Sequence, residues 1–233
     1  MNALHITTHD GKMQHIHSIS TSTLLNENCR ERAKNVLSIC HYCYSEALTK
    51  CRKQLEARLK GNTELLTKSV IPFEELPTIT DDIFRFESFG DLMNSTQVKN
   101  YFNICRKNPF TTFALWTKNP AFIDMAIKAG SAKPENIIII YSSPIIGAPA
   151  VNAKVLQRFP FIDKCFTVFT PEQAENVIIN CGSRSCFTCR KCYSKDDKTF
   201  YINEQLKGVS KKALAFLDDA LRKFKSLVKC LVA

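Results

Sequence analysis

Residues 83–143 read IFRFESFGDLMNSTQVKNYFNICRKNPFTTFALWTKNPAFIDMAIKAGSAKPENIIIIYSS. Strand and helix patterns alternate along this stretch, with strands expected at 83–88, 111–117 and 137–143 and helices at 95–108 and 120–130. The strand at 137–143 is continuously apolar, as in sheets that are covered on both faces. Alternating strands and helices joined by short links predict a parallel α/β sheet or a partial barrel, whose chemistry lies at the strand ends.

The same alternation extends in both directions from this stretch. Residues 13–25 alternate and are rich in β-branched residues and Ser, which predicts a strand followed by a loop. Residues 45–60 form one apolar helical face, and we expect Gly61 to end that helix before a surface connection over 62–80. Downstream, a strand is expected at 166–170 and a helix at 171–179.

The last residues of the chain have a different pattern. Ser210 is a favourable helix cap, and large apolar residues follow at helical spacing: Leu214, Leu217, Leu221, Phe224, Val228 and Leu231. Much of the remainder is basic: Lys211, Lys212, Arg222, Lys223, Lys225 and Lys229. This pattern predicts an amphipathic helix that packs on the protein, with a surface for nucleic acid or anionic lipid as the alternative. We therefore divide the chain into 1–193, which holds two cysteine clusters, and a C-terminal extension, 194–233.

Composition limits the class of protein. The chain has 233 residues, 45% of them hydrophobic, so a single sizeable core is the default. Its formal net charge of +10 favours anionic partners, such as a nucleic acid or a nucleotide. No apolar run is long enough to cross a bilayer and the first residues lack the layout of a secretory signal, so we expect a cytoplasmic protein. In such a protein the 11 cysteines are not expected to form a disulfide framework.

The first cysteine cluster consists of Cys29, Cys40 and Cys43, expected in the loop after the first strand. Two thiols separated by two residues turn toward one point and bind one metal ion or one cluster. Three thiolates without a clear fourth fit a 4Fe–4S cluster with one open iron. The alternatives are a zinc site completed by His41 or His17, and buried thiols without metal.

The second cysteine cluster lies in NCGSRSCFTCRKCYS, at 180–194. It consists of Cys181, Cys186, Cys189 and Cys192. Four cysteines fit either tetrahedral zinc or a cubane cluster, but thiols at two-residue intervals are closer to the C-x2-C-x2-C run of iron–sulfur loops. We therefore expect an iron–sulfur cluster here, with zinc as the alternative.

These motifs resemble a known fold and, more narrowly, a known family. A strand, a cysteine segment ending in CHYC at 40–43, a helix and further strand–helix units resemble the radical S-adenosylmethionine (SAM) fold. The stretch from about residue 13 to 193 resembles the phage-associated gene product 88 proteins, which carry a CYA-like segment, an RF…GD segment and a C-terminal C…C-x2-C-x2-C. The matching pieces are CYS at 43–45, RFESFGD at 85–91 and the second cysteine cluster.

The resemblance implies a fold, cofactors and a binding site. The fold would be a radical SAM-like partial β/α barrel with parallel strands, a cysteine-rich C-terminal loop and the amphipathic helix. The first cysteine cluster would hold a 4Fe–4S cluster whose open iron binds the methionine part of SAM. Because radical SAM loops space their cysteines C-x3-C-x2-C and Val36 stands four before Cys40, Cys29 would be the first ligand.

The acidic turn after the second expected strand would receive the ammonium of SAM. It supplies Glu87 and Asp91, and Gly90 lets the backbone approach a ligand. Polar residues at later strand ends are candidates for the same pocket, foremost Thr117 and Ser142.

We therefore expect an iron–sulfur protein of phage or mobile-element origin, a radical SAM-like enzyme with one or two 4Fe–4S clusters. Its electron donor would be a flavodoxin or ferredoxin, and its substrate is not readable from the sequence. The rival hypothesis is a non-catalytic binding protein, stabilised by zinc or an iron–sulfur cluster, that contacts nucleic acid through a basic face.

Overall fold

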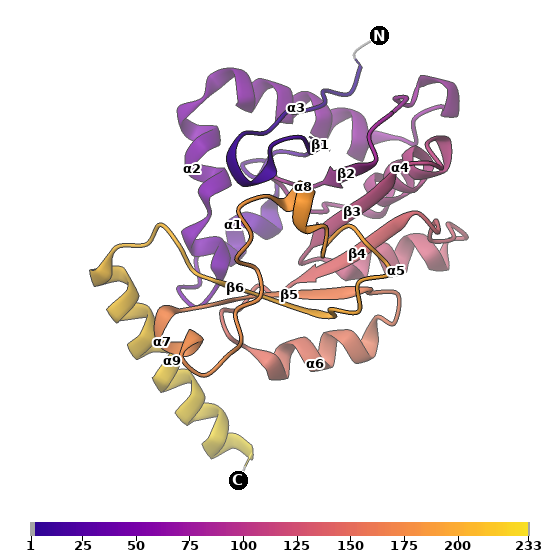
Figure 1. Cartoon of the computed structure of the whole chain (residues 1–233). Coiled ribbons are helices and arrows are strands. Elements are labelled where there is room, and N and C mark those ends of the chain that lie inside the picture. The colour runs from indigo at the N-terminus through magenta and orange to yellow at the C-terminus, as the bar shows by residue number, and fades with distance from the viewer. Residues whose placement is uncertain (1–2, 233) are drawn as a thin grey trace.

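The computed structural model describes residues 3–232, without the side chains of residues 150, 225 and 227–232. A six-stranded parallel sheet runs through the described chain (Figure 1). Its strands are β1 (His17–Ile19), β2 (Ile83–Phe86), β3 (Thr112–Thr117), β4 (Ile137–Ser142), β5 (Lys164–Phe169) and β6 (Tyr201–Gln205). The strands pair in chain order, each parallel to the next, so every strand ends at the same edge of the sheet.

Helices connect the strands and flank the sheet (Figure 1). They are α1 (Glu27–Ala33), α2 (Tyr44–Cys51), α3 (Lys53–Lys68), α4 (Ser95–Lys107), α5 (Pro120–Lys128), α6 (Pro149–Arg158), α7 (Pro171–Ala174), α8 (Cys186–Cys189) and α9 (Lys211–Val232). Short 3-10 helices occur at Gly11–Met13, Ile39–Tyr42 and Phe73–Glu75. Parallel strands need such crossovers, and crossovers are right-handed in nearly all proteins.

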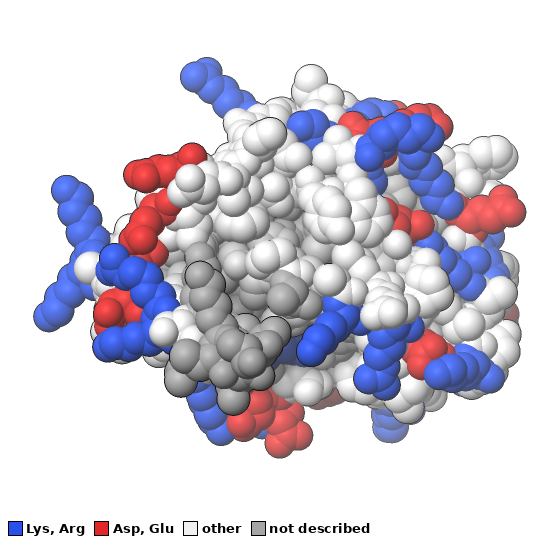
Figure 2. Space-filling view, turned by 90° about the horizontal axis from the view of Figure 1, so that it is seen from below, with Lys and Arg blue, Asp and Glu red and all other residues white. Residues whose placement is uncertain are grey.

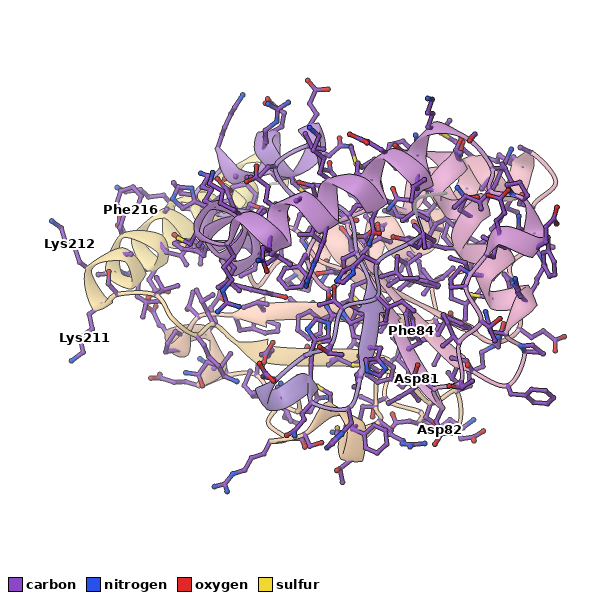
Figure 3. The ribbon with its side chains drawn as sticks, turned by 90° about the horizontal axis from the view of Figure 1, so that it is seen from above. Asp81, Asp82, Phe84, Lys211, Lys212 and Phe216 are labelled. Carbon is purple, nitrogen blue, oxygen red and sulfur yellow. The ribbon has the colours of Figure 1, made fainter. Side chains whose placement is uncertain are left out.

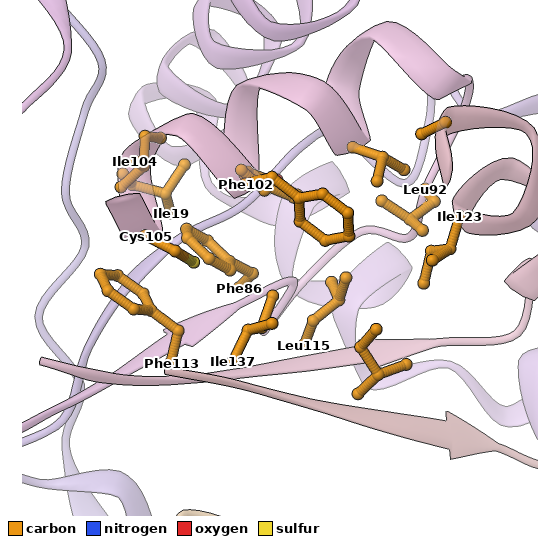
Figure 4. Close-up of a cluster of buried hydrophobic side chains, with 14 of the residues drawn as sticks. Ile19, Phe86, Leu92, Phe102, Ile104, Cys105, Phe113, Leu115, Ile123 and Ile137 are labelled. Carbon is orange, nitrogen blue, oxygen red and sulfur yellow. The ribbon is translucent and has the colours of Figure 1, made fainter. Parts of the chain in front are cut away.

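One face of the sheet packs against α3, α4 and α5. Alternate residues of the strands point to this face, among them Phe84, Phe86, Phe113 and Leu115, and helical side chains such as Phe102 and Ile123 meet them (Figure 4). Phe86 lies between two other rings, with centroids 4.1 Å from Tyr101 and 5.1 Å from Phe113. This cluster is the main hydrophobic core, and it fixes which residues of each strand are left to face the other way.

The other face of the sheet is covered by irregular segments and by two short helical turns, the 3-10 helix Gly11–Met13 and α8. Ile83, Ala114, Ile138 and Ile140 form a second buried cluster with Tyr193, and Phe187 and Met13 pack on it. The N-terminal segment and the loop of the second cysteine cluster therefore lie over this face. Every residue of β4 is buried, as its continuously apolar sequence predicts for a strand covered on both sides.

The expected helix end at Gly61 is wrong. The helix bends at Arg52, which separates α2 from α3, and α3 then continues through Gly61 to Lys68. Beyond the glycine, Asn62 is buried and hydrogen-bonds the backbone of His5 and Ser20. These contacts outweigh the cost of about 1 kcal/mol for a glycine inside a helix. The surface connection expected over 62–80 is thus partly helix.

Other differences from the expected elements involve short or polar segments. Cys29 lies in a helix, α1, where a loop was expected, and Asn26 caps that helix by accepting from the Cys29 amide. The helix expected at 171–179 is the single turn α7. Three further elements were not predicted: α6, the single turn α8, and the edge strand β6, which lies in the stretch assigned to the C-terminal extension.

The amphipathic helix expected near the C-terminus is α9, and its first half packs on the body of the protein. Leu217 and Leu221 are buried against Ile146, Val168 and Leu206. Lys211, Lys212 and Phe216 are exposed on α9 (Figure 3). Four residues of the expected apolar and basic faces have side chains that lie outside the described ones: Val228, Leu231, Lys225 and Lys229. Within residues 3–232, no helix combines the length and the apolar character needed to cross a bilayer.

Neighbouring residues of α9 allow a matched test of this packing. Leu217 is 0% exposed and Phe216 is 61% exposed. Leu217→Ala should lower the free energy of unfolding by about 2–5 kcal/mol because it leaves a cavity, whereas Phe216→Ala should change it by less than about 0.5 kcal/mol. Urea denaturation followed by circular dichroism measures both values. Equal effects of the two substitutions would show that α9 does not pack as described.

Candidate functional site

A cavity of about 1150 Å³ opens at the carboxyl ends of the strands. Its wall includes the turn after β2, Lys118 after β3, Ser142 at the end of β4 and Leu206 after β6. Six of the seven clustered cysteines also line it: Cys40, Cys43, Cys181, Cys186, Cys189 and Cys192. The two cysteine clusters, far apart in the sequence, thus face one space.

The first cysteine cluster is carried by three short elements. Cys29 lies on α1 and is buried, Cys40 lies in the 3-10 helix Ile39–Tyr42, and Cys43 is the residue before α2. The Cys40 segment is attached to the loop after β4, because the Ile39 amide donates to the Pro144 carbonyl and the Ile146 amide donates to the Leu37 carbonyl. This attachment holds the segment over the strand ends.

The thiols of the first cysteine cluster are close enough to influence one another's ionisation. Burial raises the pKa of Cys29, and the negative charge of Asp91 raises it further, while Lys118 opposes the shift. Burial also raises the pKa of Cys43. The thiolate of Cys40 raises the pKa of both Cys29 and Cys43. At neutral pH the protonated thiol is therefore the favoured form of Cys29 and Cys43.

The second cysteine cluster is shaped by a single helical turn. Ser185 caps α8, which begins at Cys186 and ends at Cys189, and Arg190 then adopts a left-handed conformation with φ 52°. This reversal turns the chain so that Cys192 lies back over the sheet, where it packs with Tyr193 on the second buried cluster. Cys181 precedes the turn and accepts a hydrogen bond from Lys12 Nζ at 3.2 Å.

Cations flank the second cysteine cluster. Burial raises the pKa of Cys192 to about 12, and the charge of Cys181 adds to this, while Arg85 opposes it. Lys12 lowers the pKa of Cys186 against a larger rise caused by burial. Lys12 itself bonds Glu204 at 3.0 Å, and the hydrogen bonds to Cys181 and Glu204 more than offset burial, so its pKa is raised.

Within the described residues, no three His, Cys, Asp or Glu side chains are gathered closely enough to hold a metal ion as they stand. The two histidines considered as a fourth ligand are engaged elsewhere. His17 Nδ1 lies 2.6 Å from Asp81 Oδ1, and His41 Nδ1 lies 2.8 Å from the Ala33 carbonyl oxygen. Neither histidine lines the cavity.

Glu87, in the turn after β2, is almost fully buried and accepts several hydrogen bonds. Tyr101 Oη donates at 2.5 Å, Gln97 Nε2 at 2.6 Å, and the hydroxyl and amide of Thr21 at 3.1 and 3.2 Å. Burial raises the pKa of Glu87 to about 7, although the hydrogen bonds oppose the rise. Its backbone has a positive φ of 58°, which redirects the chain toward Ser88.

Asp91 is equally buried and links three segments of the protein. Thr117 Oγ1 donates to its carboxylate at 2.7 Å, the Lys118 amide at 3.1 Å and Arg32 Nη1 at 3.3 Å. Asn26 Nδ2 donates to its backbone carbonyl at 2.9 Å. Asp91 therefore ties the end of β2 to the end of β3 and to α1. Thr117 contacts Asp91 and does not line the cavity.

Gly90 and Ser142 complete the set of candidate residues named from the sequence. A Cβ at Gly90 would lie 2.5 Å from Thr21 Oγ1, so the turn can pack against the segment after β1 only with glycine at this position. Ser142 is buried at the end of β4 and lines the cavity, as do Gly90, Glu87 and Asp91.

Sequence reasoning missed several residues of the cavity, notably Lys12, Arg85 and Tyr193. Arg85 alternates with Phe84 and Phe86 on β2, so its orientation away from the helices could be read from the strand pattern. Lys12 and Tyr193 carry no such signal, because Lys12 lies in a single 3-10 turn and Tyr193 in an irregular segment. Among the scattered cysteines, Cys105 and Cys165 are buried as expected, whereas Cys51 is exposed.

The parallel sheet and the cavity define an α/β protein whose strand ends face two groups of thiols. The chain belongs to the gene product 88 family, whose model matches residues 2–191. No curated protein and no solved structure matches the chain.

The raised pKa of Glu87 gives stability a specific dependence on pH. The folded protein holds the Glu87 proton up to about pH 7, whereas an unfolded glutamate loses it near 4.5, so the free energy of unfolding should fall as pH rises through this window, by about 3 kcal/mol at most. Glu87→Gln should flatten this part of the profile, and exposed Glu64→Gln should not. Urea midpoints measured between pH 4.5 and 7.5 test this prediction. Parallel profiles for the unchanged protein, Glu87→Gln and Glu64→Gln would contradict the raised pKa of Glu87.

Proposed function

We propose that this protein is an iron–sulfur protein of the radical SAM-like type. The observation that carries the proposal is that cysteines from two distant segments line a single cavity at the carboxyl ends of parallel strands. Active sites of parallel α/β folds lie at this edge of the sheet. Soft thiolate ligands suit iron–sulfur clusters or zinc.

The donor set on each side of the cavity fits a cluster in type. Cys29, Cys40 and Cys43 would hold one 4Fe–4S cluster and leave one iron open, since His17 and His41 are engaged elsewhere. The four thiols of the second cysteine cluster would hold an auxiliary cluster or a structural zinc ion. A bound cluster supplies one-electron chemistry, and a reduced flavodoxin or ferredoxin is the expected electron donor.

The surrounding charges support the same proposal. Each 4Fe–4S site with its thiolates is an anionic group. Arg32 and Lys118 lie near Cys29, and Lys12 and Arg85 lie near Cys186 of the second cysteine cluster. These cations favour the thiolate form that iron requires.

The strand order supports a radical SAM-like partial barrel. A sheet whose parallel strands follow the chain order, with right-handed crossovers, keeps its helices on one face and curves around the other. In this proposal SAM lies over the carboxyl ends of the strands, near Gly90 and Ser142. Asp91 supplies the negative charge of the turn, Glu87 holds the turn in place through its hydrogen bonds, and Thr117 positions Asp91.

Iron content tests the proposal directly. After anaerobic reconstitution the protein should be brown, absorb near about 400 nm and hold about eight irons per chain. Cys40→Ala should remove about four of them, because it disables one site, whereas Cys51→Ala, on an exposed cysteine outside both clusters, should remove none. Colorimetric iron and sulfide assays measure this. A colourless protein with stoichiometric zinc would reject the iron–sulfur assignment.

Binding of SAM tests the enzymatic part separately. Reconstituted protein reduced with dithionite should bind SAM in calorimetry and release 5′-deoxyadenosine slowly, as detected by chromatography. Asp91→Asn removes the charge but keeps an acceptor oxygen for Thr117 and the Lys118 amide, so it should weaken SAM binding and leave the iron content unchanged. Full iron loading without any SAM binding would leave a structural or electron-carrying protein.

The rival hypothesis, a metal-stabilised protein that contacts nucleic acid, has one observation in its favour. Tyr44 is 59% exposed at the cavity rim, near the exposed basic residues Arg52, Lys53 and Arg58, and an aromatic ring beside basic groups suits an unpaired base and its phosphate. The face beside α9 offers less support, because Figure 2 shows its lysine and arginine side chains dispersed among acidic ones.

A further inference from the structure

The wall of the cavity contains an arginine that no acidic side chain neutralises. Arg85 projects from β2 on the face opposite the helices, and its guanidinium lies 4.0 Å from the centre of the Trp116 ring. Its Nη1 atom contacts Met13 Sδ at 3.2 Å. Within the described part of the chain, no carboxylate lies in ion-pair distance of Arg85.

A second unsatisfied polar group belongs to the same cavity. Arg85 Nε and Tyr193 Oη are both buried and lack a hydrogen-bond partner among the described residues. Tyr193 is only 4% exposed, and Arg85 is close enough to lower its pKa against the larger rise caused by burial. Buried donors without partners are rare because each costs about 1–3 kcal/mol. Two of them at one cavity indicate that an acceptor from outside the chain belongs there.

The charge of the cavity identifies the acceptor as an anion. Nine lysine and arginine residues line the cavity, against four acidic residues, Asp10, Glu87, Asp91 and Glu204. Three of these carboxylates are already engaged. Glu87 accepts from Tyr101 and Gln97, Asp91 pairs with Arg32, and Glu204 pairs with Lys12. The remaining positive charge attracts an anionic ligand.

The thiols of the second cysteine cluster are the nearest internal alternative. In the described structure Arg85 makes its sulfur contact with Met13, and no cysteine sulfur lies in hydrogen-bond distance of its guanidinium. A guanidinium presents parallel N–H groups that match the spacing of oxygens in a carboxylate or phosphate. We infer that Arg85 and Tyr193 bind an oxyanion, the carboxylate or phosphate group of a small-molecule substrate. This inference goes beyond the proposed function and requires no bound cluster.

The tryptophan under Arg85 provides the measurement. Trp116 is the single tryptophan of the chain, so its fluorescence reports on this site. Full-length protein is titrated with inorganic phosphate and, separately, with acetate, at constant ionic strength held with sodium chloride. At least one of the two anions should give a saturable change, and comparing them tells whether the site prefers phosphate or carboxylate.

Three variants assign the signal. Arg85→Gln should weaken binding at least about tenfold, because it removes a charged hydrogen-bond donor. Tyr193→Phe removes only a hydroxyl that lies near Arg85 and has no well-formed hydrogen bond among the described residues, so the fold should persist while binding weakens about fivefold. Arg158→Gln is the control, since Arg158 lies 5.2 Å from the Phe159 ring, outside the cavity, and should bind as the unchanged protein does.

Two results would overturn the inference. One is a titration that is the same for the unchanged protein, Arg85→Gln and Tyr193→Phe. The other is an Arg85→Gln protein with reduced iron content after reconstitution and an unaltered phosphate titration, which would assign Arg85 to the thiolates. A protein that binds phosphate through Arg85 but no iron would support this inference while rejecting the proposed function.

Discussion

The carboxylate of Asp91 is the contact on which the arrangement at the strand ends depends. A buried carboxylate is tolerated only when donors surround it, and Asp91 draws them from Thr117, Lys118 and Arg32. These donors come from β3, from the residue after it and from α1, the helix that carries Cys29. Satisfying a single charge therefore places the first cysteine beside the carboxyl ends of the sheet. The part of the cavity wall around Asp91 therefore depends on these hydrogen bonds.

The central elements of the fold could be predicted because their sequences are locally consistent. The strands β2 to β5 and the helices α4 and α5 combine an apolar pattern with suitable ends, such as Pro120 at the start of α5. The edge strand β6 escaped prediction because its sequence, YINEQ, has polar residues and only one buried position. The helix end predicted at Gly61 was wrong because hydrogen bonds from Asn62 to distant backbone groups, which the local sequence does not show, favour continuation of the helix.

The residue types of the candidate site could be predicted from the sequence, but most of the contacts between its residues could not. Cysteine spacing pointed to seven thiols, and the topology explains why both groups meet, since parallel strands end together. No local pattern shows that the donors around Glu87 come from α4 and from the segment after β1, or that Tyr193 lies near Arg85. Such contacts join segments that are distant in sequence, and they exist only after the sheet has formed.

The packing of α9 also affects the order in which this protein can be completed. Leu37, Ile39 and Tyr42, the residues around Cys40, pack in the same cluster as Leu217 and Leu221. The wall that presents Cys40 is therefore finished by a segment near the end of the chain. Translation runs from the N-terminus, so the first thiols emerge from the ribosome long before the helix that secures them. Any cofactor that needs this wall in its final form has to enter after synthesis of α9, as a late step in maturation.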